Sequence, residues 1–290
     1  LTLYLLFIIE ELQLTGRREL KDKISILSLH LNVGGIEKAI CDQANMLSER
    51  YNVEIISLYK LNEEIPYKLN KNVKVIYLSQ IKPNKEEFKK NLESKNVTGV
   101  FKEGLKAIKI LYLKRKLITE YIYNSDSKII ISTRLYFTEI LNNYKNPNTI
   151  TIAEEHVYHH ENKKYIHKLD KAIKNIDYLL PASKYLTSDY KKNLKSNVLV
   201  DYIPLTINYL PEKLSKLEKN NIIAVGRLEP EKGFEDLITI MSKAIKKNKN
   251  LQLTIIGDGS QRKNIERKIK NLKLENNIRI TGYINQEELN

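Results

Sequence analysis

Short runs of β-branched and aliphatic residues alternate with helical patterns from Lys23 onward. Most of these runs are continuously apolar, which is typical of strands that are covered on both faces of a parallel sheet. Between the runs, apolar residues recur at helical spacing, as in Ile36, Ile40, Ala44 and Leu47. The predicted strands are Ile24–Leu29, Val53–Leu58, Val73–Leu78, Lys128–Ser132, Thr149–Ala153, Tyr178–Leu180, Val198–Ile203, Ile222–Val225, Leu251–Ile256 and Ile278–Thr281. This alternation predicts an α/β fold of the doubly wound type.

The segment 204–220 divides the chain. It contains Pro204 and Pro211 followed by a lysine- and glutamate-rich stretch, as expected for a domain linker. We predict a Rossmann-like domain at residues 22–204, a linker at 205–220 and a second, shorter Rossmann-like domain at 221–290. Residues 1–21 are left out of the fold prediction, because their apolar run is too short to span a bilayer and lacks the flanks of a signal peptide. A fragment end, a cloning scar and a peripheral hydrophobic anchor are all open interpretations.

The chain carries a formal net charge of +14 at pH 7 and a single cysteine, Cys41. The excess of cations predicts affinity for anions such as nucleic acid, an anionic bilayer or phosphorylated ligands, although a solvated lysine-rich surface accounts for much of it. No recognisable nucleic-acid-binding motif is present, so we predict no nucleic acid partner. The single cysteine excludes an internal disulfide and agrees with a cytoplasmic location.

The turn after the predicted strand Ile222–Val225 is unusually basic. Its sequence, VGRLEPEKGF, places Arg227 and Lys232 where a strand leads into a helix. Ligands of open parallel sheets bind beyond the carboxyl ends of the strands. Arginine can hold a diphosphate through paired hydrogen bonds, and lysine adds a mobile point charge. We therefore predict that these two residues bind a diphosphate. The alternative is that they only pair with neighbouring acids, Glu229, Glu231 or Glu235.

Two other turns are rich in glycine. Gly34 and Gly35 open the first predicted helix and let backbone N–H groups approach a ligand. Gly257 and Gly259 follow the strand Leu251–Ile256. No G-x-G-x-x-G pattern follows any predicted strand, which argues against a nicotinamide dehydrogenase, and no P-loop pattern occurs.

The histidines give only a weak metal signal. The stretch EEHVYHH, residues 154–160, contains three histidines but no H-E-x-x-H pattern and no nearby cysteine. The chain also lacks the Asp-x-Asp pair that metal-dependent transferases often use. We predict neither a bound metal nor a cofactor.

Three stretches of the second domain, VGRLEPEKGFEDLI, LTIIGDGSQRKNIE and NIRITGYINQEEL, resemble the donor-binding half of retaining glycosyltransferases of family 4. The stretch SLHLNVGGIEKAICDQANML is similar to that family's first βα unit, and ASKYLTSDYKK is similar to a stretch near the end of its N-terminal domain. The resemblance covers roughly residues 23 to 290. It implies the GT-B fold, in which two Rossmann-like domains face a cleft, with the second domain incomplete.

The resemblance also implies a reaction and its residues. A sugar would pass from a nucleotide diphosphate donor to an acceptor with its anomeric configuration retained, and fixed cations would stabilise the leaving diphosphate. Arg227 and Lys232 would hold the diphosphate, which Gly34 and Gly35 would approach from the opposite domain. His156 resembles the histidine that contacts the donor sugar; an ordinary loop imidazole is the alternative. The nucleotide-binding loops would be formed by Gly257, Gly259, Gly282, Tyr283 and Ile284.

The implied function is hexosyl transfer from a nucleotide sugar to a glycan or lipid-linked acceptor, in the synthesis of a cell-surface polysaccharide or glycolipid. Two other classes stay open: a sugar-nucleotide epimerase on the same fold, and a non-catalytic basic interaction protein. Nucleotides that shift the melting temperature separate the first two classes from the third. The product then separates transfer from epimerisation.

The stretch Lys102–Lys116 predicts a basic amphipathic helix. One face is basic and another is apolar, formed respectively by Lys102, Lys106, Lys109 and Lys116 and by Leu105, Ile108, Leu111 and Tyr112. Two interpretations are open: the helix rests on an anionic bilayer, or it covers the sheet with its lysines in solvent. The resemblance favours peripheral contact with the inner membrane face, because many relatives extend lipid-linked or envelope glycans.

The end of the sequence generates one further expectation. Relatives carry two glutamates eight residues apart beyond the G-Y-I-N-Q-E-E-L region, one on the donor sugar and one on the ribose. Here the only pair at that spacing, Glu11 and Glu19, lies in the N-terminal segment and is attributed to chance. We therefore expect a truncated glycosyltransferase, with a poorly folded second domain, an uncovered apolar edge and face, and no useful transferase activity.

Overall fold

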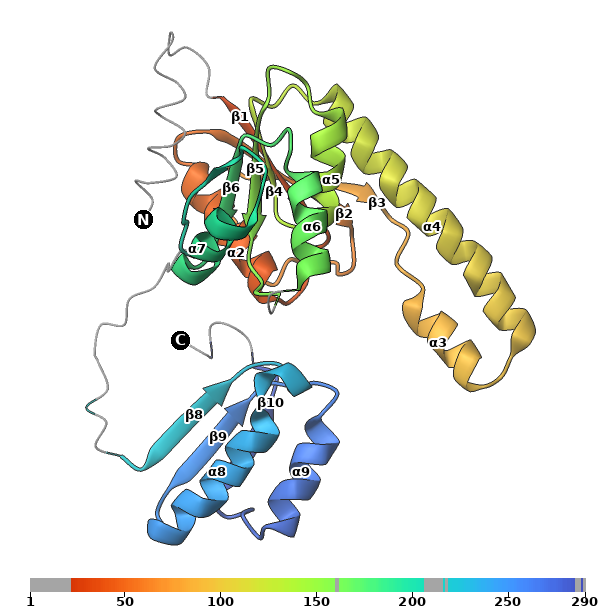
Figure 1. Ribbon diagram of the computed structural model, residues 1–290. Helices are drawn as coiled ribbons and strands as arrows, with labels where there is room; N and C mark the ends of the chain where they lie inside the picture. The colour runs from red at the N-terminus through yellow and green to blue at the C-terminus, as the bar shows by residue number, and fades with distance from the viewer. Residues whose placement is uncertain (1–21, 160–161, 206–215, 217–218, 285–287, 289–290) are drawn as a thin grey trace. The chain divides into compact units, whose positions relative to one another are not determined.

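The computed structural model of the protein describes residues 22–159, 162–205, 216, 219–284 and 288. Its Cα positions divide the chain into two compact units, Leu1–Asn208 (unit 1) and Tyr209–Asn290 (unit 2). Each unit is built on a parallel sheet with helices packed against it (Figure 1), so the predicted α/β class is confirmed. The predicted segment 1–21 and most of the predicted linker 205–220 lie outside the described residues.

Unit 1 contains a seven-stranded parallel sheet in the order β3-β2-β1-β4-β5-β6-β7. The strands are β1 (Lys23–Ser28), β2 (Asn52–Tyr59), β3 (Lys74–Ser79), β4 (Ile129–Ser132), β5 (Ile150–Glu155), β6 (Tyr178–Pro181) and β7 (Leu199–Val200). Because β1 pairs with both β2 and β4, the strand order reverses between β1 and β4. In open α/β sheets ligands bind beyond the carboxyl ends of the strands at such a reversal.

The helices of unit 1 cover both faces of the sheet. They are α2 (Gly35–Leu47), α3 (Lys85–Glu93), α4 (Val97–Asn124), α5 (Leu135–Tyr144), α6 (Lys163–Ala172) and α7 (Lys184–Asn193). One core joins the α2 residues Ile40, Ala44 and Leu47 to one face of the central strands. A second core joins residues of α4, α5, α6 and α7 to the opposite face. Burial on both faces explains why the strands read as continuous apolar runs.

The last predicted strand of unit 1, Val198–Ile203, is shorter than expected. Only Leu199–Val200 forms a ladder with β6. The backbone still donates from Asp201 to Leu179 and from Ile203 to Pro181. Pro181 has no N–H to return a bond, so the ladder cannot continue past this point.

Helix α4 packs against the sheet mainly through its C-terminal half, and Ile110 at its middle packs with Leu58 and Tyr59 of β2. Ile118 and Ile122 are fully buried, whereas Phe101 and Ile108 are 69% and 65% exposed. Figure 1 shows the N-terminal half of α4 lying beyond the sheet with α3 beside it. The interpretation of residues 102–116 as a helix that covers the sheet with its apolar face is therefore wrong for the N-terminal half. No helix in the described part of the chain is long and apolar enough to cross a membrane.

Unit 2 contains a three-stranded parallel sheet in the order β10-β9-β8. Its elements are β8 (Asn221–Val225), the 3₁₀ turn η1 (Pro230–Lys232), α8 (Phe234–Lys247), β9 (Gln252–Ile256), α9 (Arg262–Asn271) and β10 (Ile278–Gly282). Ile238, Met241, Ile255 and Ile265 lie in one core between the strands and the two helices. On edge strand β8, Ile223 and Val225 are exposed. Poor folding of this unit stays a prediction.

Shortening a side chain to alanine should destabilise unit 1 in the C-terminal half of α4 but hardly at all in the N-terminal half. Ile118→Ala should lower the free energy of unfolding of unit 1 by about 2–5 kcal/mol, because it opens a cavity in a closed core. Ile108→Ala, in the same helix, should change it by less than about 0.5 kcal/mol. Chemical denaturation followed by circular dichroism compares the two variants. A cost for Ile108→Ala as large as that for Ile118→Ala would show that the N-terminal half is buried.

Candidate functional site

The first candidate turn of unit 1 joins β1 to α2 at the reversal of strand order. Gly34 is extended and precedes the helix. The Tyr67 hydroxyl accepts a hydrogen bond from the Gly34 N–H at 2.7 Å and donates one to the Gly34 carbonyl at 2.9 Å. A Cβ at Gly34 would collide with the Glu37 carboxylate, whereas one at Gly35 would meet nothing within 4 Å. A side chain at position 34 would therefore displace the buried Glu37 carboxylate, whereas the space at Gly35 is open to a ligand.

A buried carboxylate lies directly below this turn. Glu37 is 4% exposed, and its Oε1 lies 2.8 Å from Nη2 of Arg134 and 3.6 Å from Nδ1 of His30. Arg134 comes from the turn between β4 and α5, so the cluster joins the two strands at which the order reverses. Burial lowers the pKa of His30, the Arg134 charge adds to this, and Glu37 opposes it. His30 is therefore mainly neutral at pH 7, and Arg134 is the cation of this cluster.

His156 follows β5 and is held by a second buried acid. Its Nε2 lies 3.2 Å from Oε2 of Glu154, whose other oxygen accepts a hydrogen bond from the Gln43 amide of α2. Burial alone would lower the pKa of His156, but the hydrogen bond to Glu154 and the charges of Glu154 and Glu155 outweigh it and raise the pKa. The imidazole side chain is 8% exposed, and its Nδ1 is buried with no hydrogen-bond partner among the described residues.

The carboxylate of the neighbouring acid Glu155 is bound by tyrosine hydroxyls of the helices that follow it. Tyr165 donates to both carboxylate oxygens, at 2.9 and 2.7 Å, and Tyr190 donates to one at 3.3 Å. The His159 ring stacks on Tyr165 and lies 3.6 Å from the same carboxylate. Glu155 therefore anchors α6 and α7 to the end of β5, and the loop that carries His156 starts from a fixed position.

Three turns of unit 2 are tied together by backbone contacts. The Gly226 N–H donates to Ile256, Leu228 donates to Asp258, and Gly257 donates to Gly282. A Cβ at Gly257 would collide with the Gly226 carbonyl, and one at Gly259 would lie 2.6 Å from the Leu228 carbonyl. These glycines are required because one turn crosses directly over the next, a reason that does not involve a ligand.

The acidic residues of these turns mostly bind within them. Glu229 accepts hydrogen bonds from the Ser260 N–H and hydroxyl at 3.1 and 2.7 Å. Asp258 accepts from its neighbour Gly259 and lies 2.7 Å from Nη1 of Arg262. These bonds lower the pKa of both carboxyl groups. Glu229 therefore joins the first turn to the second. Among the described residues it forms no ion pair with Arg227 or Lys232, although the Arg227 charge adds to the lowering of its pKa.

The two predicted diphosphate ligands lie on the first of these turns. Arg227 is exposed, and its Nη2 lies 3.5 Å from the exposed Glu231 carboxylate. Exposed ion pairs of this kind contribute about 0–1 kcal/mol, so an anionic ligand can replace Glu231 at little cost. Lys232 is exposed, and its ammonium group has no ion-pair partner within the described ranges. The start of α8 has no side-chain cap and lies immediately after Lys232, at Phe234.

The remaining predicted nucleotide loop follows β10. Gly282 has a φ of +80°, and a Cβ there would lie 3.3 Å from Nη1 of Arg262. Its carbonyl accepts the Gly257 N–H at 2.9 Å. Tyr283 is exposed and Ile284 is half-buried. The structure thus places Gly257, Gly259 and Gly282 together at one edge of the sheet.

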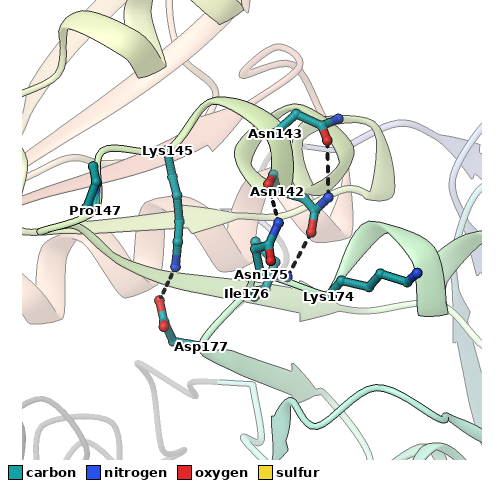
Figure 2. Close-up of a pocket in the computed structure, with 8 residues that line it drawn as sticks. All are labelled: Asn142, Asn143, Lys145, Pro147, Lys174, Asn175, Ile176 and Asp177. Atoms are coloured by element: carbon teal, nitrogen blue, oxygen red, sulfur yellow. Dashed lines mark hydrogen bonds and ion pairs between the residues drawn. The ribbon is translucent and has the colours of Figure 1, made fainter.

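A hollow of about 500 Å³ lies in unit 1, at the edge of the sheet where the strands begin (Figure 2). Its lining comes from Asn142, Asn143, Lys145, Pro147, Lys174, Asn175, Ile176 and Asp177. These residues precede β5 and β6, at the amino ends of the strands, where parallel sheets do not bind ligands. Its polar groups pair with each other, as in the 3.0 Å contact between Lys145 and Asp177. We assign this hollow a structural role.

The described residues contain no group of three or more histidine, cysteine, aspartate or glutamate side chains that could hold a metal ion. His160, one of the histidines in the EEHVYHH stretch, lies outside the described residues. The absence of a metal requirement stays a prediction.

Sequence reasoning did not identify Arg134 or Glu37 as site residues. Arg134 lies two residues after the end of a predicted strand, which is a usable signal. The order of strands in the sheet is not written in a single sequence, so the proximity of this strand end to Gly34 could not be predicted. Glu37 looked like an ordinary first-turn acid of a helix.

Removal of the Glu154 charge should lower the pKa of His156. Glu154→Gln keeps an acceptor oxygen but leaves burial unopposed by the adjacent negative charge. Histidine ring resonances followed by NMR over pH should shift for His156 and stay unchanged for His30. Because the pKa is raised in the folded state, the pair stabilises unit 1 fully below about pH 6.5, and this contribution is lost as the pH rises through the folded-state pKa. An unchanged His156 titration in the variant would contradict the assignment.

Comparison with known proteins assigns part of the chain. Residues 207–290 match the family model Glycosyl transferases group 1. A 2-deoxystreptamine N-acetyl-D-glucosaminyltransferase of Niallia circulans is 35% identical over 75 residues, which are 26% of this chain and 19% of that protein. An exopolysaccharide phosphotransferase of Streptomyces coelicolor is 23% identical over 267 residues, which are 86% of this chain and 28% of that protein. The chain thus spans under a third of the length of these curated relatives.

Solved structures share the fold at low identity. A TarM variant of S. aureus in complex with UDP superposes with a TM-score of 0.70 at 15% identity, covering 92% of this chain and 78% of that one. Anabaena HepE in complex with UDP-glucose superposes with a TM-score of 0.61 at 13% identity, covering 90% and 69%. Both are GT-B glycosyltransferases, so the predicted fold class is confirmed. Residues 207–290 correspond to a glycosyl transferases group 1 domain, and the chain shares the GT-B fold.

Proposed function

We propose that the protein is a retaining glycosyltransferase that moves a sugar from a nucleotide diphosphate sugar to a glycan or lipid-linked acceptor. The observation that carries the proposal is the pair Arg227 and Lys232, exposed on the turn between β8 and α8 within the matched segment 207–290. Cell-surface polysaccharide or glycolipid synthesis, in the cytoplasm and in contact with the inner membrane face, is the proposed context.

The chemistry of a leaving diphosphate fits this turn. Bond breaking at the anomeric carbon places negative charge on the diphosphate, and fixed cations aimed at that charge stabilise the transition state. The Arg227 guanidinium can bind two phosphate oxygens at once, while the Lys232 ammonium adds a point charge. The uncapped start of α8 adds backbone N–H groups and a favourable dipole. We propose that this set takes the place of a divalent metal.

His156 is proposed to face the donor sugar. Its Nε2 is occupied by Glu154, and its buried Nδ1 is unpaired among the described residues. A buried polar atom without a partner costs about 1–3 kcal/mol unless a ligand satisfies it. With its pKa raised, the ring can donate from Nδ1 to a sugar hydroxyl. Gly35, which has open space at its Cβ position, is proposed to let its backbone approach the donor phosphates.

The donor class is supported by the ligands of the structural neighbours. The TarM structure is a complex with UDP, and the HepE structure is a complex with UDP-glucose. We propose a nucleotide sugar for this chain, bound at its base by the turn that carries Gly282, Tyr283 and Ile284. A sugar-nucleotide epimerase would bind the same donor but release an isomer of it. A non-catalytic interaction protein would release no product.

Loss of the two cations should abolish most diphosphate affinity. Arg227→Ala or Lys232→Ala should each weaken binding of a nucleoside diphosphate by about 1.5–3 kcal/mol, the contribution of hydrogen bonds to charged groups. Isothermal titration calorimetry with UDP, GDP and ADP measures this, with Lys246→Ala at the far end of α8 as the matched control. EDTA should leave the affinity unchanged. Equal affinity for the double variant and the control would disprove the phosphate assignment.

His156→Ala should separate chemistry from binding. We expect it to reduce transfer of a labelled sugar much more than nucleoside diphosphate affinity, because the contact strengthens as the transition state forms. NMR of the product should show the donor's anomeric configuration. Unchanged turnover would return His156 to an ordinary loop role, and an inverted product would exclude the retaining mechanism.

A further inference from the structure

The N-terminal half of α4 exposes a continuous apolar stripe. It consists of Val97, Phe101, Leu105, Ile108 and Tyr112, all more than half exposed. Their spacing of four, four, three and four residues places them on one side of the helix. At 1.5 Å per residue the stripe is about 22 Å long. Contiguous exposed apolar surface of this kind is typical of sites that contact another protein or a membrane.

A basic row runs beside the stripe. Lys102, Lys109 and Lys116 recur every seven residues and project from the adjacent side of the helix. Within the described part of the chain Lys102 and Lys109 have no ion-pair partner, and Lys116 lies 3.6 Å from exposed Glu120. The row is therefore cationic beside residues 102–112 of the stripe and extends about one helical turn beyond it.

The stripe is presented by a preformed hairpin. Asn84 donates to the backbone and side chain of Glu103, at 2.8 and 2.6 Å, which fixes the start of α3 against α4. The Phe88 ring of α3 lies over Gly104, 3.9 Å from the position of a Cβ there. Asn96 caps α4 by accepting from the Gly99 N–H at 3.1 Å. The hairpin pays no ordering cost on contact with a partner.

We propose that the α3–α4 hairpin lies on an anionic lipid bilayer, with the α4 stripe inserted at the level of the headgroups and the lysine row on the lipid phosphates. Apolar side chains bordered by lysines are the pattern of interfacial helices. Charge decides against a second copy of this chain as the occupant, because pairing two such stripes would bring the lysine rows of both copies together. The proposal does not depend on the transferase reaction.

The chain contains no tryptophan, so a single introduced indole reports on one position. Phe101→Trp should show a blue-shifted emission with vesicles of phosphatidylcholine and phosphatidylglycerol, and none with phosphatidylcholine alone. The matched probe is Ile240→Trp on α8, where the native side chain is 61% exposed. It should show no shift with either vesicle.

Charge substitution then tests the stripe in sedimentation with the same vesicles. Ile108→Glu should reduce vesicle partitioning of the full chain by about tenfold or more. Ile240→Glu is the same substitution at nearly equal exposure, 61% against 65%, and should change it less than about twofold. Lys102→Gln with Lys109→Gln should weaken binding and reduce its dependence on salt.

Three results would overturn the proposal. Equal blue shifts for the tryptophans at 101 and 240 would indicate non-specific adsorption of a basic protein. Absence of vesicle binding by the native chain would exclude the membrane. Concentration-dependent self-association without vesicles that Ile108→Glu abolishes would assign the stripe to a second copy.

Discussion

Parallel pairing of the strands sends every turn that follows a strand to the same edge of its sheet, and the chemistry of both units depends on this constraint. In unit 1 it brings the turns after β1, β4 and β5 to the reversal of strand order, where Glu37 and Glu154 are buried. A buried carboxylate needs hydrogen bonds or a cation. Arg134 and His156 meet that need, so the residues that stabilise the acids are also the ones positioned at the ligand-binding edge.

The same constraint acts on the backbone of unit 2. Three short turns converge above three strands, and their carbonyls approach so closely that no Cβ fits at Gly257 or Gly259. The glycines that resemble a nucleotide loop are thus first a packing requirement. The convergence also ties the first turn to the second through the hydrogen bond between Glu229 and Ser260, while Arg227 and Lys232 stay exposed. Preorganised cations lose less entropy on binding an anion than cations on a mobile loop.

The periodicity of the sequence predicted the strands well, because strands covered on both faces must be apolar throughout. All ten predicted strands have a counterpart, and the largest error, at Val198–Ile203, comes from the missing donor of Pro181 on the neighbouring strand. A candidate site could be inferred where one motif holds its residues together, as for Arg227 and Lys232, whose binding role stays a prediction. It was missed where side chains converge from separate strands, as for Arg134 and Glu37. The exposure of the α4 stripe could not be predicted either, because amphipathic spacing does not show whether the sheet or another partner covers the apolar side.

The cations behind the net charge of +14 differ in how freely they can bind a ligand. Arg134 is held by a buried acid, and separating them would leave a charge in a poorly solvated place, which costs several kcal/mol. Arg227 has only an exposed partner, and Lys232 has no ion-pair partner within the described residues. These two cations can therefore bind an anionic ligand at a small cost in free energy. Lys102 and Lys109 are equally available but lie beside apolar side chains. We propose a small diphosphate for the first pair, because both cations lie on one short turn. An extended anionic surface is suited to the second, because only such a surface can meet a charged row and an apolar stripe at once.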